Sequence, residues 1–149
     1  MKLAIGNDHV AVEMKKEIKK YLEDKGIEVI DVGTNSTESF NYPISGYKVG
    51  KMVASGEVDG GVLICGTGVG MAIAANKVKG IRACCCSDTF SARMTRAHND
   101  ANILTFGERV VGQGLAMELV DAFLTTEFEG GRHQRRVDLI TKLEQEENS

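Results

Sequence analysis

The sequence lacks the long apolar runs and the strong charge that mark membrane and nucleic-acid-binding proteins. No apolar stretch approaches the roughly 18 residues that a bilayer-spanning helix needs. The first residues, MKLAIG, are too few and turn polar too early for a secretory signal peptide. The formal net charge is only −3, so charge gives no indication of a nucleic acid or an anionic membrane as partner. We therefore expect a cytoplasmic protein with no membrane or nucleic-acid partner.

The cysteines lack the spacing of a metal or redox site. There are four in 149 residues, with no CxxC pair, and three are consecutive, Cys84 to Cys86. Because side chains alternate along a strand, Cys84 and Cys86 would point to one face and Cys85 to the other, so they cannot hold one ion. The three histidines fall in separate segments, and the chain offers no plausible ligand set. We expect small buried thiols in a reducing compartment, no metal and no cofactor.

The periodicity of apolar residues indicates a single α/β domain over residues 1–149. Strands are expected at residues 2–6, 27–32, 58–65, 80–86 and 102–106, and helices at 10–25, 43–56, 68–78, 89–98, 115–123 and 137–143. Strands that alternate with helices form a parallel sheet covered on both faces. The prediction is a Rossmann-like three-layer sandwich with strand order 2-1-3-4-5 and an extra C-terminal helix.

In such a sheet, ligands bind beyond the carboxyl ends of the strands, at the switch point between the first and third strands. The segment Asn7-Asp8-His9 follows the first strand, and Cys65-Gly66-Thr67 follows the third. The sequence therefore predicts that these two polar loops meet and form a binding site.

The segment after the third strand has glycine at every second position, Gly66, Gly68 and Gly70, and leads into a helix. Bare N–H groups at a helix start suit an anion or a developing oxyanion, and the thiolate of Cys65 is favoured there, as a base or nucleophile. A dinucleotide fingerprint is disfavoured, because Met71 stands where its last glycine is required, and the Lys-Ser/Thr of a P-loop is absent. The alternative is a structural cysteine followed by a glycine turn.

Two further polar segments carry histidine. One is His98-Asn99-Asp100, and the other follows Gly130-Gly131 and opens the final helix. In that helix Arg132 and Arg136 are four residues apart and share a face, a spacing that suits a phosphate or carboxylate. The alternative for the arginines is a solvated basic patch.

Taken together, these segments resemble the ribose-5-phosphate isomerase B family, which also holds the galactose-6-phosphate isomerase subunits. The resemblance runs from Lys2 to about Glu144 and rests on four motifs. They are Asn-Asp-His after the first strand, Cys-Gly-Thr-Gly-Val-Gly after the third, Arg-x-His-Asn-Asp before the fifth, and Gly-Gly-Arg-His near the end.

The resemblance implies a metal-independent aldose–ketose isomerase in which Cys65 moves a proton between C1 and C2 through a cis-enediolate. It implies that His98 and Thr67 assist opening of the furanose ring. It further implies three kinds of substrate contact: N–H donors from Gly66, Gly68, Val69 and Gly70; contacts to the hydroxyls or phosphate region from Asp8, His9, Tyr42 and Asn99; and phosphate contacts from Arg109, Arg132 and Arg136, with help from His9.

Ribose 5-phosphate and ribulose 5-phosphate, of the pentose phosphate pathway, are the expected pair. Galactose-6-phosphate isomerase subunits tend to lack the His-Asn-Asp and Gly-Gly-Arg-His patterns, which favours ribose. Allose 6-phosphate remains an alternative, because one more carbon changes only the depth of the pocket. A receiver-type signalling domain shares the predicted sheet, but it needs a phospho-accepting aspartate where this chain has Cys65.

The predicted topology separates two members of the site. His98 precedes the fifth strand and Cys65 ends the third, so they lie at opposite edges of a sheet that is roughly 15–20 Å across. If both serve one substrate, His98 must come from a second chain. We therefore expect a homodimer with a shared active site, or a tetramer built from such dimers, as the family resemblance also implies.

Overall fold

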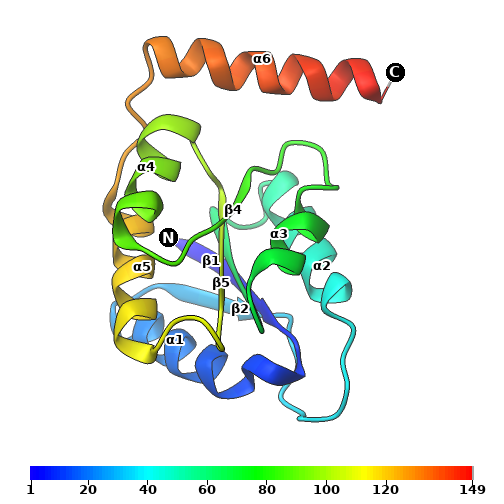
Figure 1. Cartoon of the computed structure of the whole chain (residues 1–149), viewed down its shortest axis with the longest axis vertical. Coiled ribbons are helices and arrows are strands. Elements are labelled where there is room, and N and C mark those ends of the chain that lie inside the picture. The colour runs from blue at the N-terminus through cyan, green and yellow to red at the C-terminus, as the bar shows by residue number, and fades with distance from the viewer. Residues whose placement is uncertain (149) are drawn as a thin grey trace.

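Five parallel strands and the helices between them form a three-layer α/β sandwich in the computed structural model, which describes residues 1–148 (Figure 1). The elements are β1 (Lys2–Asn7), a 3-10 turn η1 (His9–Ala11), α1 (Val12–Asp24), β2 (Glu28–Asp31), α2 (Tyr42–Ala54), β3 (Gly60–Cys65), α3 (Val69–Ala75), β4 (Ala83–Cys85), α4 (Thr89–Asn99), β5 (Ile103–Gly107), α5 (Gln113–Thr125) and α6 (Arg132–Glu147). The predicted fold class, with its extra C-terminal helix, is confirmed.

The predicted strand order was wrong at one edge of the sheet. The observed order is β2-β1-β3-β5-β4, so β5 lies beside β3 and β4 forms the edge. All five residues of β5 are buried, whereas β4 has only three residues and one of them is exposed. A continuously buried strand suits the interior of a parallel sheet, and a short, partly exposed strand suits its edge.

This order also decides which helices cover which face. Parallel strands are joined by right-handed crossovers, so crossovers that step in opposite directions along the sheet lie on opposite faces. The steps from β1 to β2 and from β4 to β5 share one direction, and α1 and α4 pack on one face together with α5. The steps from β2 to β3 and from β3 to β4 run the other way, and α2 and α3 cover the other face.

Helix α6 lies outside the sandwich, across the end of the molecule where α4 finishes (Figure 1). His133 and Val137 are its two buried residues, and the Gly80 N–H donates to a carboxylate oxygen of Glu144 at 2.9 Å. Its apolar side chains Leu139, Ile140 and Leu143 are about half exposed. Within residues 1–148, no helix combines the length and the apolar character needed to span a membrane.

The three consecutive cysteines alternate between faces as predicted, but they are not all buried. Cys86 is buried and Cys84 half-buried against the core on the α1 side. Cys85 points to the other face and is exposed, with its thiol 3.5 Å from the Thr67 carbonyl oxygen. The expectation of three buried thiols was wrong for Cys85, because β4 is an edge strand.

Candidate active site

Cys65 ends β3 with a thiol that is 5% exposed. The Gly68 N–H donates to its Sγ atom across 3.1 Å. Because a thiolate accepts hydrogen bonds more strongly than a thiol, this N–H is aimed at the form of Cys65 that can take a proton. Helix α3 is only seven residues long, so this direct contact, rather than a long helix dipole, is the main electrostatic feature at the sulfur.

The Cys65 loop, residues Cys65 to Gly70, is packed against the backbone of β5. Gly68 has φ +86°, and a Cβ added there would lie 2.7 Å from the backbone of Phe106. A Cβ on Gly107 would lie 2.4 Å from the Cα of Thr67. Two glycines therefore permit a contact that any larger residue would push apart. The neighbouring strand gives the loop its position.

Thr105 fixes the same loop by a buried hydrogen bond that sequence reasoning missed. Its side chain is 0% exposed and its hydroxyl donates to the Gly68 carbonyl oxygen at 2.8 Å. The contact spans 37 residues of chain and requires β5 beside β3. A threonine within an apolar strand was the only sequence signal. Thr105 thus holds the peptide unit next to the one that donates to Cys65.

The first polar loop lies beside the Cys65 loop, as predicted. The Asp8 N–H donates to the Ile64 carbonyl oxygen at 3.3 Å, and the Asp8 carboxylate caps η1 by accepting from the Val10 N–H at 3.0 Å. His9 accepts the Phe40 N–H on Nδ1 at 3.0 Å, so Nε2 is the ring nitrogen left to carry a proton. Both side chains are thereby held in fixed orientations.

Tyr42 and Arg109 complete this edge of the sheet. Tyr42 opens α2, and its ring lies so close to Gly70 that a Cβ there would meet it at 2.5 Å. Arg109 follows β5, its N–H donates to the Gly66 carbonyl oxygen at 3.1 Å, and its side chain passes the Gly66 backbone. A phenol and a guanidinium thus flank the Cys65 loop.

Glu108 is a further titratable group at this edge, and the sequence analysis did not single it out. Burial raises the pKa of its carboxyl group, and the negative charges of Glu17, Glu13 and Asp8 raise it further, while Arg109 opposes them. Its Oε2 atom is buried without a hydrogen-bond partner among residues 1–148. Protonation of Glu108 would remove both the cost of burying its charge and its repulsion by the neighbouring carboxylates.

The remaining predicted residues lie elsewhere in the chain. His98 and Asn99 end α4, just before β5 begins, and so lie at the amino edge of the sheet. Arg132 and Arg136 lie on the first turns of α6, where they are exposed and their spacing places them on one face. A five-residue strand separates the two edges by about 15 Å. Within one chain, the structure therefore brings together one part of the predicted site and leaves the other part apart.

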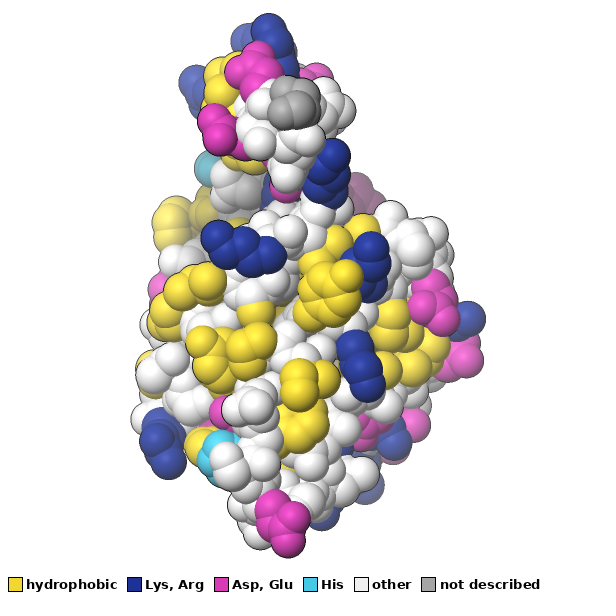
Figure 2. All heavy atoms as spheres, turned by 90° about the vertical axis from the view of Figure 1, so that its right-hand side faces the viewer, with side chains coloured by type: hydrophobic (Ala, Val, Ile, Leu, Met, Phe, Trp, Pro, Cys, Tyr) yellow, Lys and Arg dark blue, Asp and Glu magenta, His cyan; other side chains and the backbone are white. Residues whose placement is uncertain are grey.

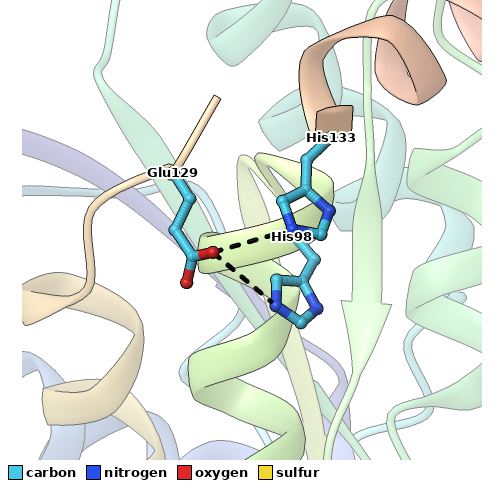
Figure 3. A group of neighbouring side chains, drawn as sticks. All are labelled: His98, Glu129 and His133. Carbon is cyan, nitrogen blue, oxygen red and sulfur yellow. Dashed lines mark ion pairs between the residues drawn. The ribbon is translucent and has the colours of Figure 1, made fainter. Parts of the chain in front are cut away.

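The prediction that the histidines stay separate was wrong for two of them (Figure 3). The rings of His98 and His133 stack with centroids 4.2 Å apart and planes 10° apart. Both face one carboxylate oxygen of Glu129, at 4.0 Å from His98 Nε2 and 3.6 Å from His133 Nε2. Burial lowers the pKa of His133, and the charges of His98 and Arg132 lower it further. We call His98, Glu129 and His133 the histidine cluster. It joins residues 31 and 35 positions apart, a contact that no spacing rule reveals.

Comparison with known proteins gives a consistent result over almost the whole chain. The sequence model of the family described as Ribose/Galactose Isomerase matches residues 3–140. Ribose-5-phosphate isomerase B of Escherichia coli strain K12 is 56% identical over 147 residues, which is 99% of each chain.

Solved structures of ribose-5-phosphate isomerase B are similar to this chain over almost its whole length. That of Clostridium thermocellum ribose-5-phosphate isomerase B is 54% identical, with a TM-score of 0.97 over 98% of this chain and 99% of that one. Ribose-5-phosphate isomerase B from Mycoplasma genitalium, solved with bound ribulose 5-phosphate, is 40% identical, with a TM-score of 0.93 over 97% of each chain. This chain belongs to the Ribose/Galactose Isomerase family.

Proposed function

We propose that this chain interconverts ribose 5-phosphate and ribulose 5-phosphate in the pentose phosphate pathway, without a metal or cofactor. The observation that carries the proposal is the Cys65 thiol, buried at the carboxyl end of β3 and hydrogen-bonded by the Gly68 N–H at 3.1 Å. The close similarity to ribose-5-phosphate isomerase B supports the choice of substrate. The four cysteines are free, which fits a reducing compartment such as the cytoplasm.

The reaction needs a base and oxyanion donors. In the open-chain aldose, the Cys65 thiolate removes the proton on C2 and electrons move onto the carbonyl oxygen, giving a cis-enediolate. The same sulfur returns the proton to C1, while a proton shifts between the two oxygens, and the ketose results. Because charge develops on oxygen in this step, donors fixed before the reaction lower the barrier most.

The N–H groups of the Cys65 loop face different acceptors. Gly68 directs its N–H at Cys65, and Val69 directs its N–H at the Thr67 hydroxyl oxygen at 3.2 Å. We therefore assign the enediolate contacts chiefly to the Gly66 and Gly70 N–H groups. The Thr67 hydroxyl accepts from Val69 and keeps its own proton for donation to the sugar ring. Asp8, His9 and Tyr42 are assigned to the hydroxyls and Arg109 to the phosphate.

His98, Asn99, Arg132 and Arg136 serve the same substrate only if a second copy supplies them. We propose a homodimer in which these residues face the Cys65 loop of the partner, with the arginines on the phosphate and His98 at the ring oxygen. One chain cannot deliver His98 to its own Cys65 across about 15 Å of sheet. The site is incomplete without the second copy.

Exposed apolar side chains support this docking. Figure 2 views the molecule from the side of α2 and α3, where apolar side chains gather on the surface below the projecting α6. Ile44, Tyr47, Val69 and Ile73 on these two helices are each about half exposed. Such a surface beside a site is typical of a protein interface. We assign it to the second copy, together with the apolar stripe of α6.

The test is a coupled assay that follows ribulose 5-phosphate formed from ribose 5-phosphate, with allose 6-phosphate and galactose 6-phosphate as rival substrates. We expect kcat/KM to be highest for ribose 5-phosphate. If kcat/KM were higher for a six-carbon sugar phosphate, that sugar phosphate would be the substrate in place of ribose 5-phosphate. Turnover of none of the three would refute the isomerase assignment, and the receiver-type alternative would then be tested by incubation with a small phospho-donor.

A further inference from the structure

We propose that the histidine cluster is a binding site for a divalent transition-metal ion, Zn²⁺ above all, and that the bound ion inhibits the enzyme. Among residues 1–148, this is the one group of three His, Cys, Asp or Glu side chains whose ligand atoms converge, all within 4.8 Å of one another. Figure 3 shows the two imidazole rings stacked side by side, each with a nitrogen atom facing the same carboxylate oxygen of Glu129. The proposed zinc binding does not depend on what the enzyme does, whereas the proposed inhibition rests on the proposed function.

The chemistry of the three side chains suits zinc. Two imidazoles and one carboxylate form a common zinc ligand set, with a fourth position left open. At bond lengths of about 2.0–2.2 Å, tetrahedral ligands lie roughly 3.3–3.5 Å apart. The carboxylate oxygen of Glu129 is already 3.6 Å from His133 Nε2 and 4.0 Å from His98 Nε2. A sub-ångström contraction brings these two contacts to coordination distance, and the widest pair of ligand atoms, within 4.8 Å, must close by about 1.3 Å.

A second observation points to a missing partner at this place. His133 is 94% buried, yet its Nε2 atom has no hydrogen-bond partner among residues 1–148. The carboxylate oxygen of Glu129 that faces it is too distant at 3.6 Å to form a hydrogen bond. A buried polar atom without a partner costs free energy, and an ion bound between the side chains removes that cost.

The other two ligands are free to adjust. The side chains of His98 and Glu129 are 39% and 56% exposed, whereas that of His133 is only 7% exposed and holds its place. In the observed stack, the imidazole planes are nearly parallel, so their lone pairs do not converge fully. Binding therefore requires the exposed His98 ring to tilt toward Glu129. Arg132 and Arg136 act on His133 as positive charges, so they oppose the ion and limit its affinity.

The consequence for catalysis follows from the proposed role of His98. An imidazole whose Nε2 is bound to zinc cannot donate or accept a proton through that atom, and the bound ion fixes the ring away from the sugar. The bound ion also adds positive charge and bulk where the partner's substrate would lie. Zinc should therefore lower activity and chelation should restore it, which is the reverse of the behaviour of a zinc-dependent enzyme.

The binding test uses Zn²⁺ itself in equilibrium dialysis of the purified full chain. We expect one cluster site per chain, weakened at least tenfold by Glu129→Gln, since even residues that only support a metal ligand change affinity roughly 10–100-fold. His133→Gln provides a second variant with a ligand removed. Glu127→Gln is the matched control, because Glu127 is an exposed carboxylate in the same segment and outside the cluster. It should bind zinc as the wild type does.

The inhibition test measures ribose 5-phosphate turnover against Zn²⁺ concentration. Wild type and Glu127→Gln should lose activity together and recover on adding EDTA, while Glu129→Gln should need at least tenfold more zinc. Equal sensitivity of all variants would place the ion on a thiol such as Cys65 and overturn the proposal. So would unchanged zinc binding by Glu129→Gln and His133→Gln. If no variant turns over the substrate, the proposed function fails, and the dialysis result still decides the metal site.

Discussion

The Cys65 loop and the histidine cluster lie at opposite edges of the same sheet and are held in different ways. The loop is fixed by buried contacts: the Thr105 hydroxyl on the Gly68 carbonyl oxygen, the close approach of Gly68 to Phe106, and that of Gly107 to Thr67. The cluster is held by one ring stack and by two charge contacts of 3.6 and 4.0 Å, with an exposed carboxylate and one half-exposed imidazole.

This difference corresponds to the tasks that we propose for them. A base and its oxyanion donors must be positioned before the reaction, because donors that have to reorganise contribute less to catalysis. In the proposed dimer, His98 meets the substrate only across the interface. Within its own chain it contacts Glu129, in the loop before α6, and His133 on α6. The comparison therefore predicts that substitutions at the loop affect chemistry within each chain, while substitutions at the cluster affect the partner's site.

The largest effect is expected at Cys65. Cys65→Ala removes the proposed base and should lower kcat roughly 10²–10⁴-fold, the usual contribution of general acid–base catalysis. Its far-UV circular dichroism and its binding of ribose 5-phosphate should persist. Cys84→Ala is the matched control, because its sulfur lies half-buried on the other face of the sheet. Near-normal turnover by Cys65→Ala would show that another group is the base.

A mixing experiment tests whether the two edges serve one substrate. Cys65→Ala and His98→Ala are each expected to be nearly inactive. After dissociation and reassembly in equal amounts, half of the dimers contain one intact and one doubly damaged site, so about a quarter of wild-type activity should return. Mass spectrometry verifies the mixed dimers. If they form without recovery, both residues act within one chain or His98 is not catalytic.

A smaller effect is expected when the support of the loop is removed. Thr105→Val keeps the shape but loses the hydroxyl, and the Gly68 carbonyl oxygen still accepts from the Ala72 N–H at 3.1 Å. The net value of one hydrogen bond, about 1 kcal/mol, predicts a fall in kcat of roughly fivefold with KM nearly unchanged. Thr105→Ser should restore kcat. A loss of stability without any change in kcat or its pH profile would mean that Thr105 only packs.

The smallest effect concerns Glu108. Its pKa is raised in the folded chain, so the folded state binds its proton more tightly than the unfolded state, and stability falls as pH rises through the raised pKa. Glu108→Gln should remove that loss and raise Tm by at most a few degrees near pH 8, with no gain at pH 4. Thermal unfolding at both pH values is the measurement. An equal Tm change at both would attribute the effect to packing instead of charge.

Local sequence patterns predicted most of the residues at the carboxyl edge of the sheet, where Cys65 lies. The apolar run that ends in Cys65, the alternating glycines and the polar segment after β1 located the candidate base and its neighbours. Topology alone placed His98 at the far edge. Apolar runs located the strands and apolar periodicity located the α-helices, because the burial of an element is recorded in its own residues, whereas the short turn η1 was not predicted separately. The assignment of roles, however, came from the family resemblance.

The tertiary structure decided what depends on neighbours across the sheet. Strand adjacency is not recorded in a single segment, so the order of β4 and β5 was predicted wrongly, and so was the burial of Cys85. The same adjacency places Thr105, Phe106 and Gly107 under the Cys65 loop. The stack of His98 on His133 depends on where α6 returns to α4. Sequence periodicity reports which side of an element is buried, and only packing of the whole chain chooses what it is buried against.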